Sequence, residues 1–345
     1  MHLGMTGLRG ISDDKELEPW LKDIVAAEHM LSDKEILSGA HFGVVECLRT
    51  GTTTVCDMYD PMDVSIAAAK ALGIRLVNLP NFFTVHRTLD AQEIPTLVPS
   101  LRGLPSTITQ GIAPHSIYGT DEKFLRAVTT YAAKESLLVH IHVAETRKER
   151  VMCKQKTGFL PVEYLNHIGF LHSNVMIAHA VWLTKHELDL LAKHEVKVVH
   201  CPQSNMKLAG GGVLALKEMM ERKITVCLGT DSTASNNSLD MFRAMYVTAL
   251  LHKHHYWDPT VANAQTVLDM ATRNGARAIG REKDLGSIES GKIADIITLD
   301  LHDANLMPID KKRVVSHLVY AAQGLNVAEV IVDGKLLLKE KMFVK

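Results

Sequence analysis

The segment LLVHIHVAE, residues 137–145, has the composition of a β-strand that ends in ligand-type side chains. Alternation along a strand places His140 and His142 on the same face. His142 lies nearer the carboxyl end and is the better candidate for a metal ligand, whereas His140 lies one layer deeper. Glu145 follows the strand and can lean over the same end. Two histidines in a strand are equally typical of a packed core. Whether they belong to a metal site therefore depends on the residues at the ends of the other strands.

Similar apolar runs recur on both sides of this segment. Seven runs are strand-like: residues 52–56, 74–79, 107–112, 137–143, 175–178, 196–199 and 224–228. Helix-like segments lie between them, among them residues 61–72, 121–134, 185–194 and 213–222. Alternating strands and helices predict parallel strands with helical crossovers, which form either a doubly wound sheet or a (β/α)8 barrel.

Polar side chains at the ends of these runs favour the barrel. They follow or close most of the runs: Asp57, His115, His142, His179, His200 and Asp231. Strand ends of a barrel converge on one mouth, whereas a doubly wound sheet has its site at one switch point, usually with a glycine-rich phosphate turn. The sequence therefore predicts an α/β fold in which residues 1–285 form a TIM-type barrel that lacks its first strand. Residues 286–345 are β-rich, with a hairpin predicted at Asp333-Gly334.

Composition places the chain among ordinary globular proteins. Its 345 residues carry 38 basic and 39 acidic side chains, a net charge of −1, so nothing favours nucleic-acid or membrane partners. The five cysteines are scattered without a CxxC pair, which indicates reduced thiols. No signal peptide or membrane-length apolar run is visible, and we expect a cytoplasmic location. A homo-oligomer remains an open alternative.

Three strand ends together supply a metal-ligand set. His142, His179 and Asp231 offer nitrogen and oxygen donors suited to Zn²⁺ or Fe²⁺. A buried carboxylate such as Asp231 requires a cation or hydrogen bonds. A divalent metal brings the pKa of its water to about 7. Asp231 is then expected to take the water's proton, Glu145 to protonate a substrate ring nitrogen, and His179 to steady the developing charge.

Longer motifs carry a family resemblance. They are HIHVAET (140–146), MIAHA (176–180), HCPQSNMKLAGG (200–211) and LGTDSTASNNSLDM (228–241), with MHLGMTGLRG (1–10), APHSIYG (113–119), GSIESGKIADIITLDL (286–301) and SHLVYAAQG (316–324). In this order they resemble the amidohydrolase superfamily, specifically its 5-methylthioadenosine/S-adenosylhomocysteine deaminases. The resemblance covers almost the whole chain. It implies hydrolytic deamination of an adenine nucleoside to the inosine analogue plus ammonia, with one divalent metal ion.

The resemblance also implies residue roles. It makes His2, His142 and Asp231 metal ligands, Glu145, His179 and Asp231 catalytic, and Trp20, Glu28, His115 and Glu145 substrate-binding. The family's first barrel strand and the sandwich strands before it have no counterpart, so residues 286–345 are expected to be the remnant of a small β-sandwich.

Two other interpretations stay open from the sequence. One is a related amidohydrolase that acts on guanine or an s-triazine. The other is a shortened, inactive chain that acts only through protein contacts, because a barrel without one strand exposes two strand edges. The cluster HKHHYW (252–257) is expected to lie on a solvated surface.

Overall fold

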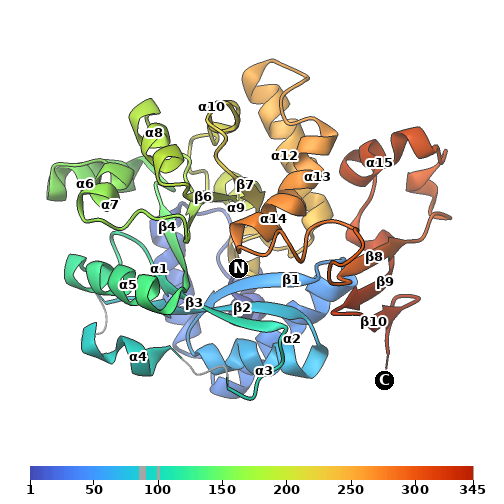
Figure 1. The fold of residues 1–345 in the computed structure, drawn as a ribbon, viewed down its shortest axis with the longest axis horizontal. Coiled ribbons are helices and arrows are strands. Elements are labelled where there is room, and N and C mark those ends of the chain that lie inside the picture. The colour runs from blue at the N-terminus through green and yellow to red at the C-terminus, as the bar shows by residue number, and fades with distance from the viewer. Residues whose placement is uncertain (85–90, 99–101, 345) are drawn as a thin grey trace.

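The computed structural model describes residues 1–84, 91–98 and 102–344, which form two β-sheets with surrounding helices (Figure 1). The larger sheet has seven parallel strands in chain order: β1 (Thr54–Tyr59), β2 (Arg75–Phe82), β3 (Ile108–Pro114), β4 (Leu138–Val143), β5 (Val175–His179), β6 (Lys197–His200) and β7 (Val226–Leu228). Cys56 of β1, Leu138 of β4 and Cys227 of β7 contribute to one apolar cluster, so the sheet curls around its own interior. The predicted alternation of strands and helical crossovers is confirmed.

Helices cover the outer face of the curled sheet (Figure 1). The longer ones are α1 (Leu17–Glu28), α2 (Asp33–Arg49), α3 (Met62–Leu72), α5 (Glu122–Glu135), α6 (Arg147–Thr157), α8 (Lys185–Lys193), α12 (Met241–Tyr256) and α13 (Ala264–Ala271). Shorter ones are α4 (Ile94–Leu97), α7 (Pro161–His167), α9 (Pro202–Lys207), α10 (Leu216–Glu221), α11 (Thr233–Asn236), α14 (Arg273–Ala278) and α15 (Val314–Tyr320). In α5, Asp121 caps the first turn, and Phe124 and Val128 are buried against the sheet. Within the described residues, no helix has the length and apolarity needed to cross a membrane.

Below the carboxyl ends of its strands, the interior of the sheet is an apolar floor that α14 completes. Met58, Val77 and their neighbours form one interior cluster, and Met176 with Cys227 forms another. Ile279, just after α14, packs against both clusters. At the edge of the sheet, Asn274 Nδ2 donates to the Val226 carbonyl at 2.9 Å. A helix therefore fills the interior beside β7 and satisfies part of its edge.

The first residues of the chain lie against the free edge of β1. The Met1 amine donates to the Cys56 carbonyl at 2.8 Å, and the Met58 N–H donates to the Met1 carbonyl at 2.9 Å. This is the hydrogen-bond pattern of a parallel bridge. The Leu3 N–H donates to Asp57 Oδ1 at 2.7 Å and fixes the start of the 3-10 helix η1 (Leu3–Leu8). His2 is thereby brought to the carboxyl end of the sheet.

The smaller sheet is antiparallel and lies at the C-terminal side of the molecule (Figure 1). Its order is β11-β10-β9-β8, with β8 (Ile296–Leu299), β9 (Val327–Val332), β10 (Lys335–Lys339) and β11 (Met342–Phe343). Asp333 and Gly334 both have positive φ, 54° and 75°, which confirms the predicted hairpin. Arg75, at the start of β2, pairs with Asp295 at 2.7 Å and joins this sheet to the floor of the larger one.

Candidate active site

One pocket at the carboxyl ends of the strands contains every site residue that the sequence predicted. These are His2, Trp20, Glu28, His115, His142, Glu145, His179 and Asp231. They come from the N-terminal segment, from α1 and from the ends of four strands, so their convergence depends on the curl of the sheet. Trp20 and Glu28 lie on α1, which covers the mouth from one side.

The backbone at the mouth is turned in an unusual way. Ala144, His179, Ala180 and Asp231 all have positive φ, between 50° and 70°. Residues other than glycine seldom adopt this region, and such strain gathers at functional sites. The turns carry the side chains of Glu145, His179 and Asp231 inward.

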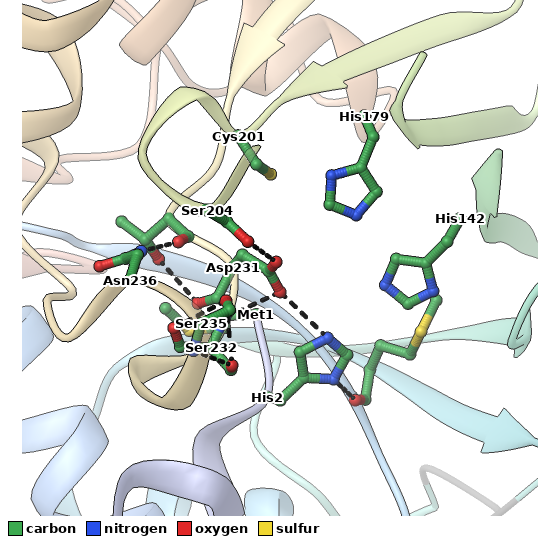
Figure 2. Close-up of polar contacts among 12 residues, drawn as sticks. Met1, His2, His142, His179, Cys201, Ser204, Asp231, Ser232, Ser235 and Asn236 are labelled. Carbon is green, nitrogen blue, oxygen red and sulfur yellow. Dashed lines mark hydrogen bonds and ion pairs between the residues drawn. The ribbon is translucent and has the colours of Figure 1, made fainter. Parts of the chain in front are cut away.

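Two histidines turn their Nε2 atoms toward this mouth. His2 Nδ1 donates to the Met58 carbonyl at 2.6 Å, and His142 Nδ1 donates to the His115 carbonyl at 2.8 Å. Because a carbonyl only accepts, Nδ1 carries a proton in both rings, and Nε2 has a lone pair in the neutral form of either ring. Figure 2 shows both rings turned toward Asp231, with His2 Nε2 at 3.3 Å from Asp231 Oδ1. Two acceptors this close repel each other unless a proton or a metal cation lies between them.

Asp231 is held as a carboxylate. Ser204 Oγ donates to Oδ2 at 2.6 Å, and the Ser232 N–H donates to Oδ1 at 2.8 Å (Figure 2). Burial alone would raise the pKa of Asp231, but the hydrogen bond and charge that His2 supplies in its protonated form, together with His179, hold this pKa well below its usual range. A carboxylate fixed by a hydroxyl and an amide, beside imidazoles fixed through Nδ1, is the arrangement that supports metal ligands.

His2, His142 and Asp231 therefore fit a divalent cation by their chemistry. The ring centroids of His2 and His142 are 5.5 Å apart. Over the described ranges, no three His, Cys, Asp or Glu side chains already form a closed ligand group. The fit rests on the donor set, which offers two imidazole nitrogens and one carboxylate oxygen, as Zn²⁺ and Fe²⁺ prefer.

Glu145 and His179 form the second polar pair. Glu145 Oε2 lies 3.7 Å from His179 Nε2, and both side chains are buried. Burial, with repulsion from Asp231, raises the pKa of Glu145 to about 8. Asn205 Nδ2 donates to His179 Nδ1 at 3.0 Å, which leaves the His179 proton on Nε2, facing Glu145. Burial also lowers the pKa of His179, so the ring is neutral.

The opposite wall of the pocket has its own polar group. The Tyr59 hydroxyl donates to Glu28 Oε1 at 2.5 Å, and burial raises the pKa of Glu28. Trp20 Nε1 donates to the Ala234 carbonyl at 3.2 Å, which fixes the indole as an apolar wall. Asn81 also lines the pocket, and its Oδ1 is buried without a hydrogen bond to the described residues.

Sequence reasoning missed several contributors to this site. Val77 and Leu79 face the interior, so alternation along β2 could have identified Asn81 as the next inward side chain. Ser204 and Asn205 lie in the HCPQSN motif, but only the structure shows that they support Asp231 and His179. Tyr59 had no signal beyond its position at the end of β1.

The expectation for the HKHHYW cluster was wrong at one position. His254 and His255 are exposed, but His252 is fully buried and lies 3.1 Å from His200, Nε2 to Nε2. The ring of His200 faces away from the sheet interior toward α12, because the neighbouring Val199 faces inward. This pair lies behind β6, outside the pocket lining.

Known proteins similar to this chain agree with the architecture. The model for the amidohydrolase family matches residues 1–337. A 5-methylthioadenosine/S-adenosylhomocysteine deaminase of Thermococcus sibiricus is 40% identical over 98% of this chain and 80% of its own length. A 5'-deoxyadenosine deaminase of Methanothermobacter thermautotrophicus is 41% identical over the same shares. The zinc-bound structure of an adenosine deaminase from Xanthomonas campestris is 32% identical, with a TM-score of 0.92 over 99% of this chain and 79% of that one.

These likenesses confirm the predicted fold class. The curled seven-stranded sheet is of the TIM-barrel type, and the small antiparallel sheet follows it in the chain. The match of the family model extends over nearly all residues of both sheets. The chain therefore belongs to the amidohydrolase family.

Proposed function

We propose that this protein is a metal-dependent deaminase of adenine nucleosides, such as 5-methylthioadenosine or S-adenosylhomocysteine, which yields the inosine analogue and ammonia. The observation that carries the proposal is the pair Glu145 and Asp231, whose pKa values are shifted in opposite directions within one buried pocket. A proton donor and a proton acceptor side by side are what hydrolytic deamination requires. The names of the relatives support the adenine nucleoside as substrate.

His2, His142 and Asp231 would hold one divalent cation, and zinc is favoured because the similar adenosine deaminase contains it. When bound, such a cation makes a coordinated water far more acidic. The hydrogen bonds at His2 Nδ1 and His142 Nδ1 keep the Nε2 lone pairs available for it. Ser204 restrains the carboxylate of Asp231 in the same way.

Three side chains would move protons. Asp231, ionised, accepts the proton of the attacking water. Glu145 is protonated near neutral pH, because its pKa is about 8, and it donates to the ring nitrogen beside the amino-bearing carbon. His179 donates from Nε2 to the oxygen on which charge develops. The proton that Asp231 has taken is then passed to the amino group, which leaves as ammonia.

The other wall would orient the nucleoside. Trp20 and the apolar residues beside it, Leu17 and Leu21, offer a flat surface for the purine. Glu28 and His115 offer hydrogen bonds to the ribose hydroxyls.

The test is a substrate panel read by ammonia release, with metal content measured on the same sample. We expect turnover of 5-methylthioadenosine, S-adenosylhomocysteine, 5'-deoxyadenosine or adenosine, with kcat/KM for guanine and an s-triazine lower by about 10²-fold or more. Chelation should abolish turnover and Zn²⁺ should restore it. Protein that contains stoichiometric metal and releases no ammonia from any adenine nucleoside would refute the proposal.

A further inference from the structure

Two helices, α6 and α8, begin with the same motif, a threonine followed three residues later by a glutamate. Thr146 and Glu149 open α6, and Thr184 and Glu187 open α8. Each threonine Oγ1 accepts the backbone N–H of its glutamate at 3.2 Å. Both glutamates are buried, with exposed fractions of 6% and 0%, and burial raises the pKa of each. The two carboxylates are therefore close structural equivalents.

The equivalents differ in which backbone groups they hold. Glu187 accepts the N–H of Thr184 at 2.9 Å, which is an ordinary capping box, and the N–H of Val162 at 3.1 Å. Glu149 instead reaches further back along its chain. It accepts the N–H of Ala144 with Oε1 and the N–H of Glu145 with Oε2, each at 2.9 Å. One carboxylate stabilises helix starts, and the other holds the segment that carries a pocket residue.

The segment held by Glu149 has a conformation that its own residues disfavour. Ala144 has φ of 53°, in the left-handed region where a Cβ is strained. Its carbonyl accepts the N–H groups of Val181 and Trp182, each at 3.0 Å. The turn is thus held by Glu149 on its amide side and by residues just after His179 on its carbonyl side. In this arrangement the Glu145 carboxyl faces His179.

We propose that Glu149 is a positioning residue for Glu145. It does not line the pocket, and it acts only through the backbone of residues 144 and 145. The proposal rests on the proposed function, because the position of Glu145 matters only if Glu145 transfers a proton. The carboxylate is essential to the role: a glutamine can accept one of the two N–H groups, but its own NH₂ then faces the other.

The experiment compares Glu149→Gln with Glu187→Gln, which changes the same chemical group in the equivalent setting. Three quantities are measured: steady-state kinetics on the adenine nucleoside that the wild type turns over best, thermal unfolding, and hydrogen exchange of the amides of residues 144 and 145. For Glu149→Gln we expect kcat to fall by about 10²-fold with KM changed less than about threefold. Both amides should exchange at least about tenfold faster.

Glu187→Gln should lower the unfolding temperature comparably, keep kcat within about threefold of the wild type, and leave the two amides protected. The proposal is overturned if Glu149→Gln keeps wild-type kcat while its amides exchange faster, or if Glu187→Gln loses as much kcat. Should Glu149→Gln not fold, Glu149→Asp takes its place, and wild-type kcat with unprotected amides again overturns the proposal. Failure of the proposed function is distinguishable from failure of this proposal, because in that case the wild-type protein itself releases no ammonia.

Discussion

At the carboxyl end of the seven strands, Glu145 and His179 are buried, and residues at or just after the ends of β4, β5 and β7 adopt left-handed backbone conformations. At the amino end, the interior is filled by Met176, Cys227, Ile279 and their apolar neighbours, and the buried Arg75 is paired with Asp295 and Asp333. The same strands pass through both ends. The acids at the mouth have pKa values shifted in opposite directions, whereas the buried cation at the floor is paired with a carboxylate.

This contrast predicts that stability and catalysis can be changed separately. In barrels of this type, residues at the carboxyl ends of the strands serve function, and those at the amino ends serve stability. The strain and the unbalanced charge at the mouth persist because the floor and the outer helices supply the folding free energy. Substitutions at the carboxyl ends of the strands should therefore lower kcat without lowering the unfolding free energy, and substitutions at the amino ends should do the reverse.

The largest expected effect is that of Glu145→Gln. The pKa of Glu145 is raised by burial to about 8, so folding stability falls as pH rises from the unfolded value, near 4.5, through the folded one. Glutamine removes this penalty and also removes the proton donor. We expect kcat to drop by about 10³-fold, and the unfolding free energy of metal-free protein at pH 7 to rise by about 1–3 kcal/mol.

Ammonia release measures the expected fall in kcat, and denaturant unfolding measures the expected rise in unfolding free energy. A Glu145→Gln protein that is both less active and less stable would break the proposed contrast, because its loss could then be a folding defect.

Arg75→Met is expected to have the reverse signature. Arg75 is 2% exposed and donates to both oxygens of Asp295, at 2.7 and 2.9 Å. Its removal leaves the buried carboxylate of Asp295 without its paired cation, although the Asp333 N–H still donates to it, and this should cost about 3 kcal/mol of unfolding free energy. The kcat of the folded fraction should stay within about twofold of the wild type, because the site is at the other end of the strands.

The control for this change is the double variant Arg75→Met with Asp295→Leu, which removes both charges. It should recover part of the lost stability in urea unfolding. A double variant as unstable as the single one would show that the ion pair is not the source of the effect.

The smallest expected effect concerns the pair His200 and His252, between β6 and α12. Burial, with the charge of His255, lowers the pKa of His252 to about 4, against the partial opposition of Glu218. The folded state therefore resists protonation, and its stability should decline as pH falls from the unfolded value of 6.5 toward 4. We expect this decline to account for about 1–2 kcal/mol.

His252→Gln keeps a hydrogen bond to His200 without the titration. Unfolding free energies at several pH values between 4 and 7 should therefore change less in this variant than in the wild type. Identical pH dependence in both proteins would show that His252 does not titrate on unfolding.

Much of this contrast could be read from the sequence. Apolar runs with ligand-type residues at their ends identified the seven strands, the direction of the mouth and the site residues His142, Glu145, His179 and Asp231. The family resemblance supplied His2, Trp20, Glu28 and the role of His115, and all eight residues line one pocket. This works because strand alternation and strand direction are local properties that the chain cannot avoid. The hairpin at Asp333-Gly334 was predictable for the same reason.

What could not be predicted depends on contacts between distant segments. Glu149 reads as an ordinary helix-capping glutamate, and only its hydrogen bonds to residues 144 and 145 distinguish it from Glu187. His252 lies in a polar cluster and is buried because His200 of another element meets it. The roles assigned to the site residues remain predictions until the variants above are measured.

The place of Ile279 has a consequence for how the protein is made. All seven strands of the large sheet lie before residue 229, yet Ile279, which packs against both apolar clusters of their interior, is added by the ribosome some fifty residues later. Until then the nascent barrel exposes an uncovered apolar cavity and an unsatisfied edge at β7. Chaperone binding during synthesis should therefore be strongest between the emergence of β7 and that of α14. We expect the nascent chain to be inactive over that interval.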